Sequence, residues 1–221
     1  MFAGRKFAAF LFDMDGTVLN SIAAAERVWT TWAHRHGLDV ASFLPTIHGR
    51  RARETIAALK LPGIDPIAEA DALLKAEAAD LEGIVPIPGA VAFLDSLPPE
   101  RWAIVTSAPR ELALLRIAAA GIPVPATMVT AEDVTRGKPA PDCFLLAARR
   151  LGVEAHDCLI FEDAPAGIAA GEAAGGSVMV ISATHVHPVV TPHPAIRSYD
   201  EIGTTVDDTG CIALSAARAA A

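Results

Sequence analysis

Short apolar runs alternate with longer segments of helical periodicity over most of the chain. The apolar runs span residues 7–12, 102–106, 158–161 and 178–181. Nearly unbroken apolar runs of this length are typical of strands that are covered on both faces, as in a parallel sheet. The helical segments, most of them followed by a glycine, span residues 89–97, 109–120, 142–151 and 165–174. This alternation predicts an α/β fold: a Rossmann-like parallel sheet with helices on both faces.

Residues 20–86 interrupt the alternation, because they show helical periodicity and no convincing strand. The helices predicted in this segment span about residues 21–37, 53–59 and 65–83. Ser21 is expected to cap the first of them, and Trp29 and Trp32 are expected to lie in the core of the segment. We therefore predict an α/β core domain of residues 1–19 and 87–221, with a small helical domain of residues 20–86 inserted into it.

Composition narrows the possible partners. The formal net charge is −8, and an acidic chain repels phosphodiester backbones, so we expect no nucleic-acid partner. No apolar run approaches the ~20 residues needed to cross a bilayer, so we expect no membrane partner. The three cysteines are widely spaced, which favours reduced thiols over a zinc site or a disulfide framework. The apolar start reads as a buried strand rather than a signal peptide, and we expect a cytoplasmic monomer.

Polar side chains stand where the predicted strands end, and one lysine stands just before a predicted helix. In chain order these residues are Asp13, Asp15, Thr106, Ser107, Lys138, Glu162 and Asp163. Ligands of open α/β sheets bind outside the carboxyl ends of the strands, where these groups would gather. Each group alone has a plain structural explanation as a turn or helix-capping residue. Their recurrence at successive strand ends is much harder to explain in that way.

This set of groups suits phosphoryl transfer. One carboxylate can attack phosphorus, which divides a difficult reaction into two easier steps. A second carboxylate two residues away can protonate the leaving oxygen and later deprotonate the attacking water. Carboxylates at two strand ends can hold Mg²⁺, and an ammonium group with hydroxyl or amide donors can hold the remaining phosphate oxygens.

Four of these segments resemble the motifs of the haloacid dehalogenase superfamily, in the order that the family shows. They are FDMDGT at 12–17, VTS at 105–107, KP at 138–139 and FED at 161–163. The resemblance implies a haloacid dehalogenase-like core in which Asp13 is the nucleophile and Asp15 the general acid and base. It also implies an Mg²⁺ ion held by Asp13, the backbone carbonyl of Asp15, and Asp163.

The same resemblance assigns phosphate binding to Thr106, the amide of Ser107, and Lys138. The helical segment after the first motif resembles the family's small cap of the C1 type. A finer resemblance is to the sugar-phosphatase branch, which includes 2-deoxyglucose-6-phosphatases and glycerol-phosphate phosphatases. It rests in part on ERVW at 26–29, WAHRHG at 32–37 and IHGR at 47–50. The expected partner is therefore a small phosphorylated metabolite, a sugar or polyol phosphate, hydrolysed through a phosphoaspartyl intermediate on Asp13.

Three residues of the insert are candidates for contact with the rest of the substrate. His48 and Arg50 lie in a loop between predicted helices, and the planar donor fork of arginine suits anionic or polyhydroxyl ligands. Glu26 lies near the expected hinge and can accept from substrate hydroxyls. The alternatives are a solvated loop for the first two residues and a solvated helix face for Glu26.

Other functions stay open. The nearest is a sugar phosphomutase of the same fold; similar mutases place a histidine where this chain has Ala25. Haloacid dehalogenation would not need Asp15, and phosphonate cleavage would need a cap lysine that nothing marks. From a different class, the chain could be a phosphate-responsive binding or regulatory module that does not hydrolyse its ligand.

Two further groups of polar residues stand outside these motifs. His185, His187 and His193 share one proline-rich loop. Three histidines in one loop can form a zinc site, but no carboxylate stands nearby in the sequence. We interpret the loop as structural. Arg51 and Arg53 are expected to be surface charges.

Overall fold

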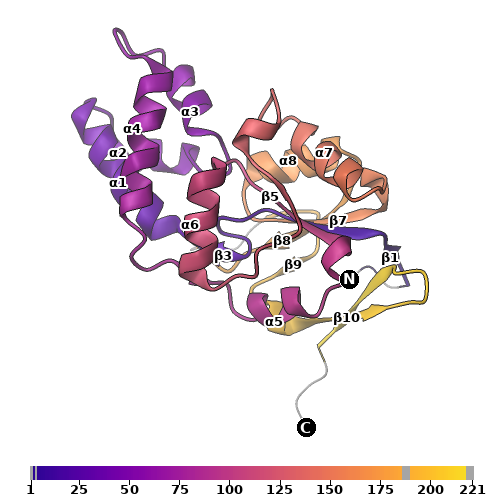
Figure 1. The fold of residues 1–221 in the computed structure, drawn as a ribbon. Helices are drawn as coiled ribbons and strands as arrows, with labels where there is room; N and C mark the ends of the chain where they lie inside the picture. Colours follow the sequence, from indigo (N-terminus) through magenta and orange to yellow (C-terminus); the bar gives the residue numbers. More distant parts are fainter. Residues whose placement is uncertain (1, 3, 186–189, 218–221) are drawn as a thin grey trace.

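A six-stranded parallel sheet forms the centre of the protein. The computed structural model describes residues 2, 4–185 and 190–217 (Figure 1). In spatial order the strands are β6 (Thr127–Val129), β5 (Trp102–Val105), β2 (Ala9–Phe12), β7 (Cys158–Glu162), β8 (Ser177–Ile181) and β9 (Ala195–Ile196). Every neighbouring pair is parallel. The predicted α/β fold is confirmed, and β2 lies where the chain order reverses, between β5 and β7.

Helices cover both faces of this sheet (Figure 1). They are α5 (Ala90–Asp95), α6 (Arg110–Ala120), α7 (Asp142–Arg150) and α8 (Pro165–Ala173). Because side chains alternate along a strand, β2 feeds two separate cores. Phe10 and Phe12 pack with residues of α5 and α6, whereas Ala9 and Leu11 pack with residues of α7 and α8. Burial on both faces explains why the strand sequences are apolar throughout.

The predicted first strand is divided into two. β1 (Lys6–Phe7) leaves the main sheet and pairs antiparallel with β11 (Ile212–Ala216), which forms a hairpin with β10 (Ile202–Val206). Only β2 joins the parallel sheet. The prediction of one strand over residues 7–12 is therefore wrong at its start, because the partner of β1 lies some 200 residues away in sequence.

The insert is bracketed by a short antiparallel pair, β3 (Leu19–Asn20) and β4 (Val85–Pro86). Its helices are α1 (Ile22–Arg35), α2 (Val40–Phe43), α3 (Ala52–Leu59) and α4 (Pro66–Ala79). They share a core in which Trp29 and Trp32 are buried, as predicted. Figure 1 shows them gathered on one side of the molecule, away from the β10–β11 hairpin. In the described part of the chain, every helix is too short or too polar to cross a bilayer.

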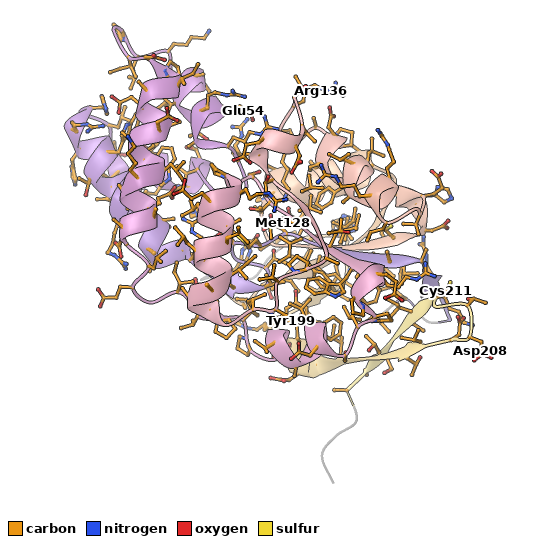
Figure 2. All side chains as sticks on the ribbon, viewed as in Figure 1. Glu54, Met128, Arg136, Tyr199, Asp208 and Cys211 are labelled. Atoms are coloured by element: carbon orange, nitrogen blue, oxygen red, sulfur yellow. The ribbon has the colours of Figure 1, made fainter. Side chains whose placement is uncertain are left out.

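Arg51 fastens the insert to the core. The expectation that it is a surface charge is wrong: its side chain is buried, and it donates to the carbonyls of Val134 (2.8 Å) and Thr135 (3.1 Å). Glu54 accepts from the N–H of Gly137, and Figure 2 shows Glu54 beside the loop that carries Arg136. These contacts hold α3 against the segment that precedes Lys138.

Candidate active site

A cavity lies between the insert and the strand ends of the core. Its lining includes Asp13, Asp15, Thr106 and Ser107 from the core, and His48, Gly49 and Arg50 from the insert. These residues come from three separate parts of the sequence. The structure therefore brings the strand-end residues and the candidate loop of the insert to the same cavity.

Asp13 follows β2 directly and is 4% exposed. Its N–H donates to the carbonyl of Phe161 on β7, which extends the sheet bonding to the last residue before the loop. Burial and the charge of Glu162 raise the pKa of Asp13 to about 7, while Lys138 acts in the opposite direction. A carboxylate at this position therefore needs more positive charge nearby than Lys138 alone supplies.

Lys138 is the buried cation of the site, with 1% of its surface exposed. Its ammonium donates to Asp13 (2.5 Å), Glu162 (2.6 Å) and the carbonyl of Val105 (3.1 Å). All three donors of the ammonium group are thus used by residues at the ends of β2, β5 and β7. Lys138 holds the three strand ends at a fixed spacing around Asp13.

Glu162 supports Lys138. One carboxylate oxygen accepts from Lys138, and the other accepts from the N–H groups of Asp163 (2.9 Å) and Ala164 (3.1 Å). The sequence alone left open whether Glu162 completes a metal shell. These contacts use both oxygens of the carboxylate, so they favour a role in fixing Lys138 and the Asp163 backbone.

Asp13, Glu162 and Asp163 offer carboxylate oxygens that all lie within 4.8 Å of one another. Burial, then Glu162 and Asp13, raise the pKa of Asp163 well above its ordinary value. Three buried carboxylates face one lysine, so the cluster carries an excess of negative charge in a medium of low dielectric constant. A divalent cation between Asp13 and Asp163 would balance that charge, and oxygen ligands suit a hard cation.

The turn after β2 is shaped to admit Asp163. Gly16 has a φ of +83°, and a Cβ at this position would overlap the Asp163 carboxylate. Thr17 donates from its hydroxyl to Asp163 (3.3 Å), and Tyr199 donates to the carbonyl of Thr17 (3.2 Å). Glycine at residue 16 is therefore required both by the backbone conformation and by the close approach of β7.

Asp15 points away from this cluster. Its Oδ1 accepts from the hydroxyl of Ser21 (2.5 Å) and from the guanidinium of Arg116 (3.0 Å). Ser21 stands at the N-cap position of α1, as predicted, but its side chain makes no capping hydrogen bond; the side chain of Asn20 accepts from Ile22 N–H instead (3.1 Å). The two aspartates of the first motif therefore have different surroundings.

Thr106 and Ser107 follow β5. The hydroxyl of Thr106 accepts from the N–H of Ala108 (3.0 Å), which fixes the loop, and Ser107 donates to the carbonyl of Gly49 (3.0 Å). The second contact joins the core loop to the loop of the insert. Both residues line the cavity beside Asp13, where the resemblance places the phosphoryl group.

The loop of the insert is held from two sides. His48 Nε2 lies 3.1 Å from Glu26 Oε1, so these two candidates contact each other, while Arg50 is exposed at the cavity. Gly49 has a φ of +73°, and a Cβ there would lie 2.7 Å from the Cβ of Ala164. Glycine allows the loop to pack directly on the core.

The histidines of the proline-rich loop have separate contacts. His185 Nε2 lies 3.0 Å from the carbonyl oxygen of Asp163, and His193 Nε2 lies 2.7 Å from Glu172. His187 lies outside the described residues. His185 thus contacts the backbone of the site, whereas His193 contacts α8.

Arg116 and Glu77 were not among the predicted site residues. Both line the cavity, and Arg116 lies within hydrogen-bond distance of Asp15 and Glu77. A signal was present for Arg116, because it interrupts an otherwise apolar helix face formed by Leu112, Ala113 and Ile117. A charge on such a face is either paired or functional.

Comparisons with known proteins agree with this geometry. The sequence profile of a family described as haloacid dehalogenase-like hydrolase matches residues 7–175. The chain is 41% identical to hexitol phosphatase A of Escherichia coli over 210 residues, which cover 91% of this chain and 95% of that protein. It is 33% identical to glycerol-1-phosphate phosphohydrolase 2 of Saccharomyces cerevisiae, over 81% of this chain and 76% of the relative.

Solved structures are similar as well. A hydrolase from Pseudomonas syringae matches with a TM-score of 0.69 and 25% identity, over 80% of this chain and 84% of that one. A β-phosphoglucomutase from Clostridium difficile matches with a TM-score of 0.71 over 79% and 84% of the two chains. At 22% identity, the second match speaks for a shared fold only.

Proposed function

The chain belongs to the haloacid dehalogenase-like hydrolase family and is a phosphoric monoester hydrolase; we propose that it hydrolyses a polyol or sugar phosphate through a phosphoaspartyl intermediate on Asp13. The observation that carries the proposal is the buried contact of Asp13 with Lys138 at the edge of a cavity that also contains Asp15. The hexitol and glycerol phosphatases among its relatives favour a polyol phosphate over other esters.

Asp13 attacks phosphorus and accepts the phosphoryl group. Lys138 holds the attacking carboxylate in place from the side of the sheet. Thr106 and Ser107 line the cavity, and in this proposal the Thr106 hydroxyl and the Ser107 amide donate to phosphoryl oxygens. The chain supplies few positive charges here, so neutralisation of the phosphate requires a cation as well.

Mg²⁺ is the cation we propose, held by Asp13, Asp163 and the backbone carbonyl of Asp15. When bound, it would neutralise charge on a phosphoryl oxygen and on the two carboxylates. The excess of buried negative charge at this cluster supports the assignment. The chain's own part is to fix the two carboxylates at the ends of β2 and β7.

Asp15 serves as general acid and base. It protonates the leaving alkoxide while the ester is cleaved, and it then removes a proton from the water that attacks the phosphoaspartate. Its position in the cavity wall, held by Ser21 and Arg116, supports this role.

The helical insert, residues 20–86, acts in this proposal as a cap that contacts the leaving group. His48, Arg50 and Glu26 are its candidate hydroxyl contacts: His48 and Arg50 line the cavity, and Glu26 on α1 lies outside the lining but contacts His48. Ala25 also lines the cavity and carries no group that transfers protons. This favours hydrolysis over the phosphomutase alternative.

The substitution Asp13→Asn tests the nucleophile. It keeps the shape of the side chain and removes the attacking charge, so phosphate release from a hexitol phosphate should fall below about a hundredth of the wild-type rate, a loss of ~2.7 kcal/mol. The matched control is Asp95→Asn, an exposed carboxylate on α5, which should leave the rate unchanged.

Residual activity above that level in Asp13→Asn would exclude Asp13 as the nucleophile. A wild-type protein that binds Mg²⁺ but releases no phosphate from a panel of phosphorylated metabolites would favour the binding or regulatory module instead.

A further inference from the structure

Arg116 is a charged residue on the buried face of α6, where its neighbours are Leu112, Ala113 and Ile117. Only 5% of its surface is exposed. Burying a guanidinium is costly unless its donors are paired. Its presence on an apolar helix face therefore needs an explanation from the cavity that it lines.

Two carboxylates from different parts of the chain pair with Arg116. Nη1 donates to Asp15 of the core (3.0 Å), and Nη2 donates to Glu77 of the insert (3.1 Å). Glu77 is itself buried on α4, which lies next to α6 in Figure 1. The ion pairs thus join the core, the active-site turn and the insert at one point.

The pairing of the Arg116 guanidinium is incomplete within the described part of the chain. Nε is buried and has no hydrogen-bond partner there. A buried donor without an acceptor costs about 1–3 kcal/mol. Arg116 lines the cavity that contains Asp13, and Nη1 and Nη2 each carry a second N–H, so an oxygen atom of a bound ligand can accept from the guanidinium.

The arrangement suits a hydroxyl group better than a charged one. Arg116 offers a donor and Glu77 an acceptor, and a hydroxyl both accepts and donates. With Asp15 protonated as the general acid, the charges of Glu77 and Arg116 cancel, so the group of three offers no net positive charge to an additional anion. A leaving group with neutral hydroxyls would be accepted, and one with a second phosphate or a carboxylate disfavoured.

We propose that Arg116 and Glu77 form a hydroxyl-recognition site that selects uncharged polyol leaving groups beside the proton donor Asp15. The proposal rests on the function given above and refines its substrate class. In this proposal Arg116 holds Asp15 through Nη1 and offers its remaining donors to the leaving group.

Kinetics of Arg116→Lys and Glu77→Gln test the proposal. Lysine retains a positive charge near Asp15 but lacks Nε–H, and glutamine retains the shape of Glu77. Each variant should lose about ten- to hundredfold in kcat/KM for a hexitol phosphate, mostly through KM. Each should stay within about threefold for p-nitrophenyl phosphate, which offers no hydroxyls. Glu77→Gln should also gain relative activity toward a hexitol bisphosphate.

The control is Arg110→Lys on the exposed end of α6, which should change neither substrate. Equal losses on both substrates, carried by kcat, would overturn the proposal and make Arg116 a positioning residue for Asp15 alone. No loss on either would overturn it and leave a structural tie between α4 and α6. Failure of the wild type on hexitol phosphate, with p-nitrophenyl phosphate hydrolysed, would instead reject the proposed substrate class.

Discussion

At the scale of single residues, the site depends on charges that are buried and mutually paired. Burial alone would lower the pKa of Lys138, but Asp13 and Glu162 raise it above its ordinary value, so the ammonium stays protonated. Glu162 in turn is fixed by two backbone N–H groups. Asp13 is therefore oriented before any ligand arrives, which is how a preorganised site reduces the cost of reaching the transition state.

Asp15→Asn should affect substrates according to their leaving groups. A polyol alkoxide needs a proton in order to leave, whereas p-nitrophenolate does not, and general acid catalysis contributes about 10²–10⁴-fold. We therefore expect a loss of at least about a hundredfold for a hexitol phosphate. With p-nitrophenyl phosphate, rapid-mixing measurements should show an initial burst, because only dephosphorylation of Asp13 then lacks its base. Equal losses on both substrates without a burst would argue against the role of Asp15.

The strand-end residues were predictable from sequence, and the helix-face residues were not. Asp13 and Asp163 each follow an apolar run, and parallel strands end at one edge, so local pattern alone brings them together. Arg116 meets Asp15 and Glu77 across separations of 101 and 39 residues. Neither pairing with Arg116 is implied by a motif or a period, because each depends on how α6 packs against the active-site turn and against the insert.

At the scale of elements, the proposed metal site belongs to two neighbouring strands. β2 and β7 are paired from Ala9–Cys158 to Phe12–Phe161, and the register places Asp13 beside Glu162 and Asp163. The short strands β6 and β9 escaped prediction, since three and two residues are too few to show a period. The hairpin that captures β1 was also missed, because its half-polar strands resemble loop sequence.

Removal of the metal should stop catalysis without unfolding the sheet. Treatment with EDTA should abolish phosphate release from a hexitol phosphate, and Mg²⁺ should restore it. Ca²⁺ should not replace Mg²⁺, because its larger and looser coordination would displace Asp13 from in-line attack. Circular dichroism of the EDTA-treated protein serves as the control for folding. Full activity in metal-free buffer would rule out the proposed cofactor.

Arg51→Met should affect all substrates alike. The side chain ties α3 to the loop before Lys138, and hydrogen bonds made by a charged group are worth about 1.5–3 kcal/mol. We expect a lower melting temperature and a similar fall in kcat/KM for a hexitol phosphate and for p-nitrophenyl phosphate. The exposed Arg53, two residues away, provides the matched control, and Arg53→Met should change neither quantity. A loss confined to the hexitol phosphate would instead place Arg51 in substrate recognition.

At the scale of the whole molecule, stability and catalysis draw on the same buried charges. The α/β core and the insert each have a hydrophobic cluster of their own, and the cavity lies where the two meet. Burial that raises the pKa of Asp13 and Asp163 also makes their ionised forms costly in the folded state. At neutral pH the metal-free protein should therefore be less stable than its complex with the metal.

Melting curves as a function of pH test this coupling. The pKa of Asp13 in the metal-free fold is about 7, above its ordinary 3.8. Between these values the folded state keeps a proton that the unfolded chain has released, so the stability of the metal-free protein should fall as pH rises from about 4 to about 7.

Mg²⁺ binds the ionised carboxylates, so it should stabilise the protein more at pH 8 than at pH 5. At a concentration 100 times its Kd, the gain at pH 8 should be about 2.7 kcal/mol, which raises Tm by about 5–10 °C for a chain of this size. Asp163→Asn removes one proposed ligand and should abolish most of that increase while the variant stays folded. An increase of equal size at both pH values would show that Mg²⁺ acts elsewhere on the protein.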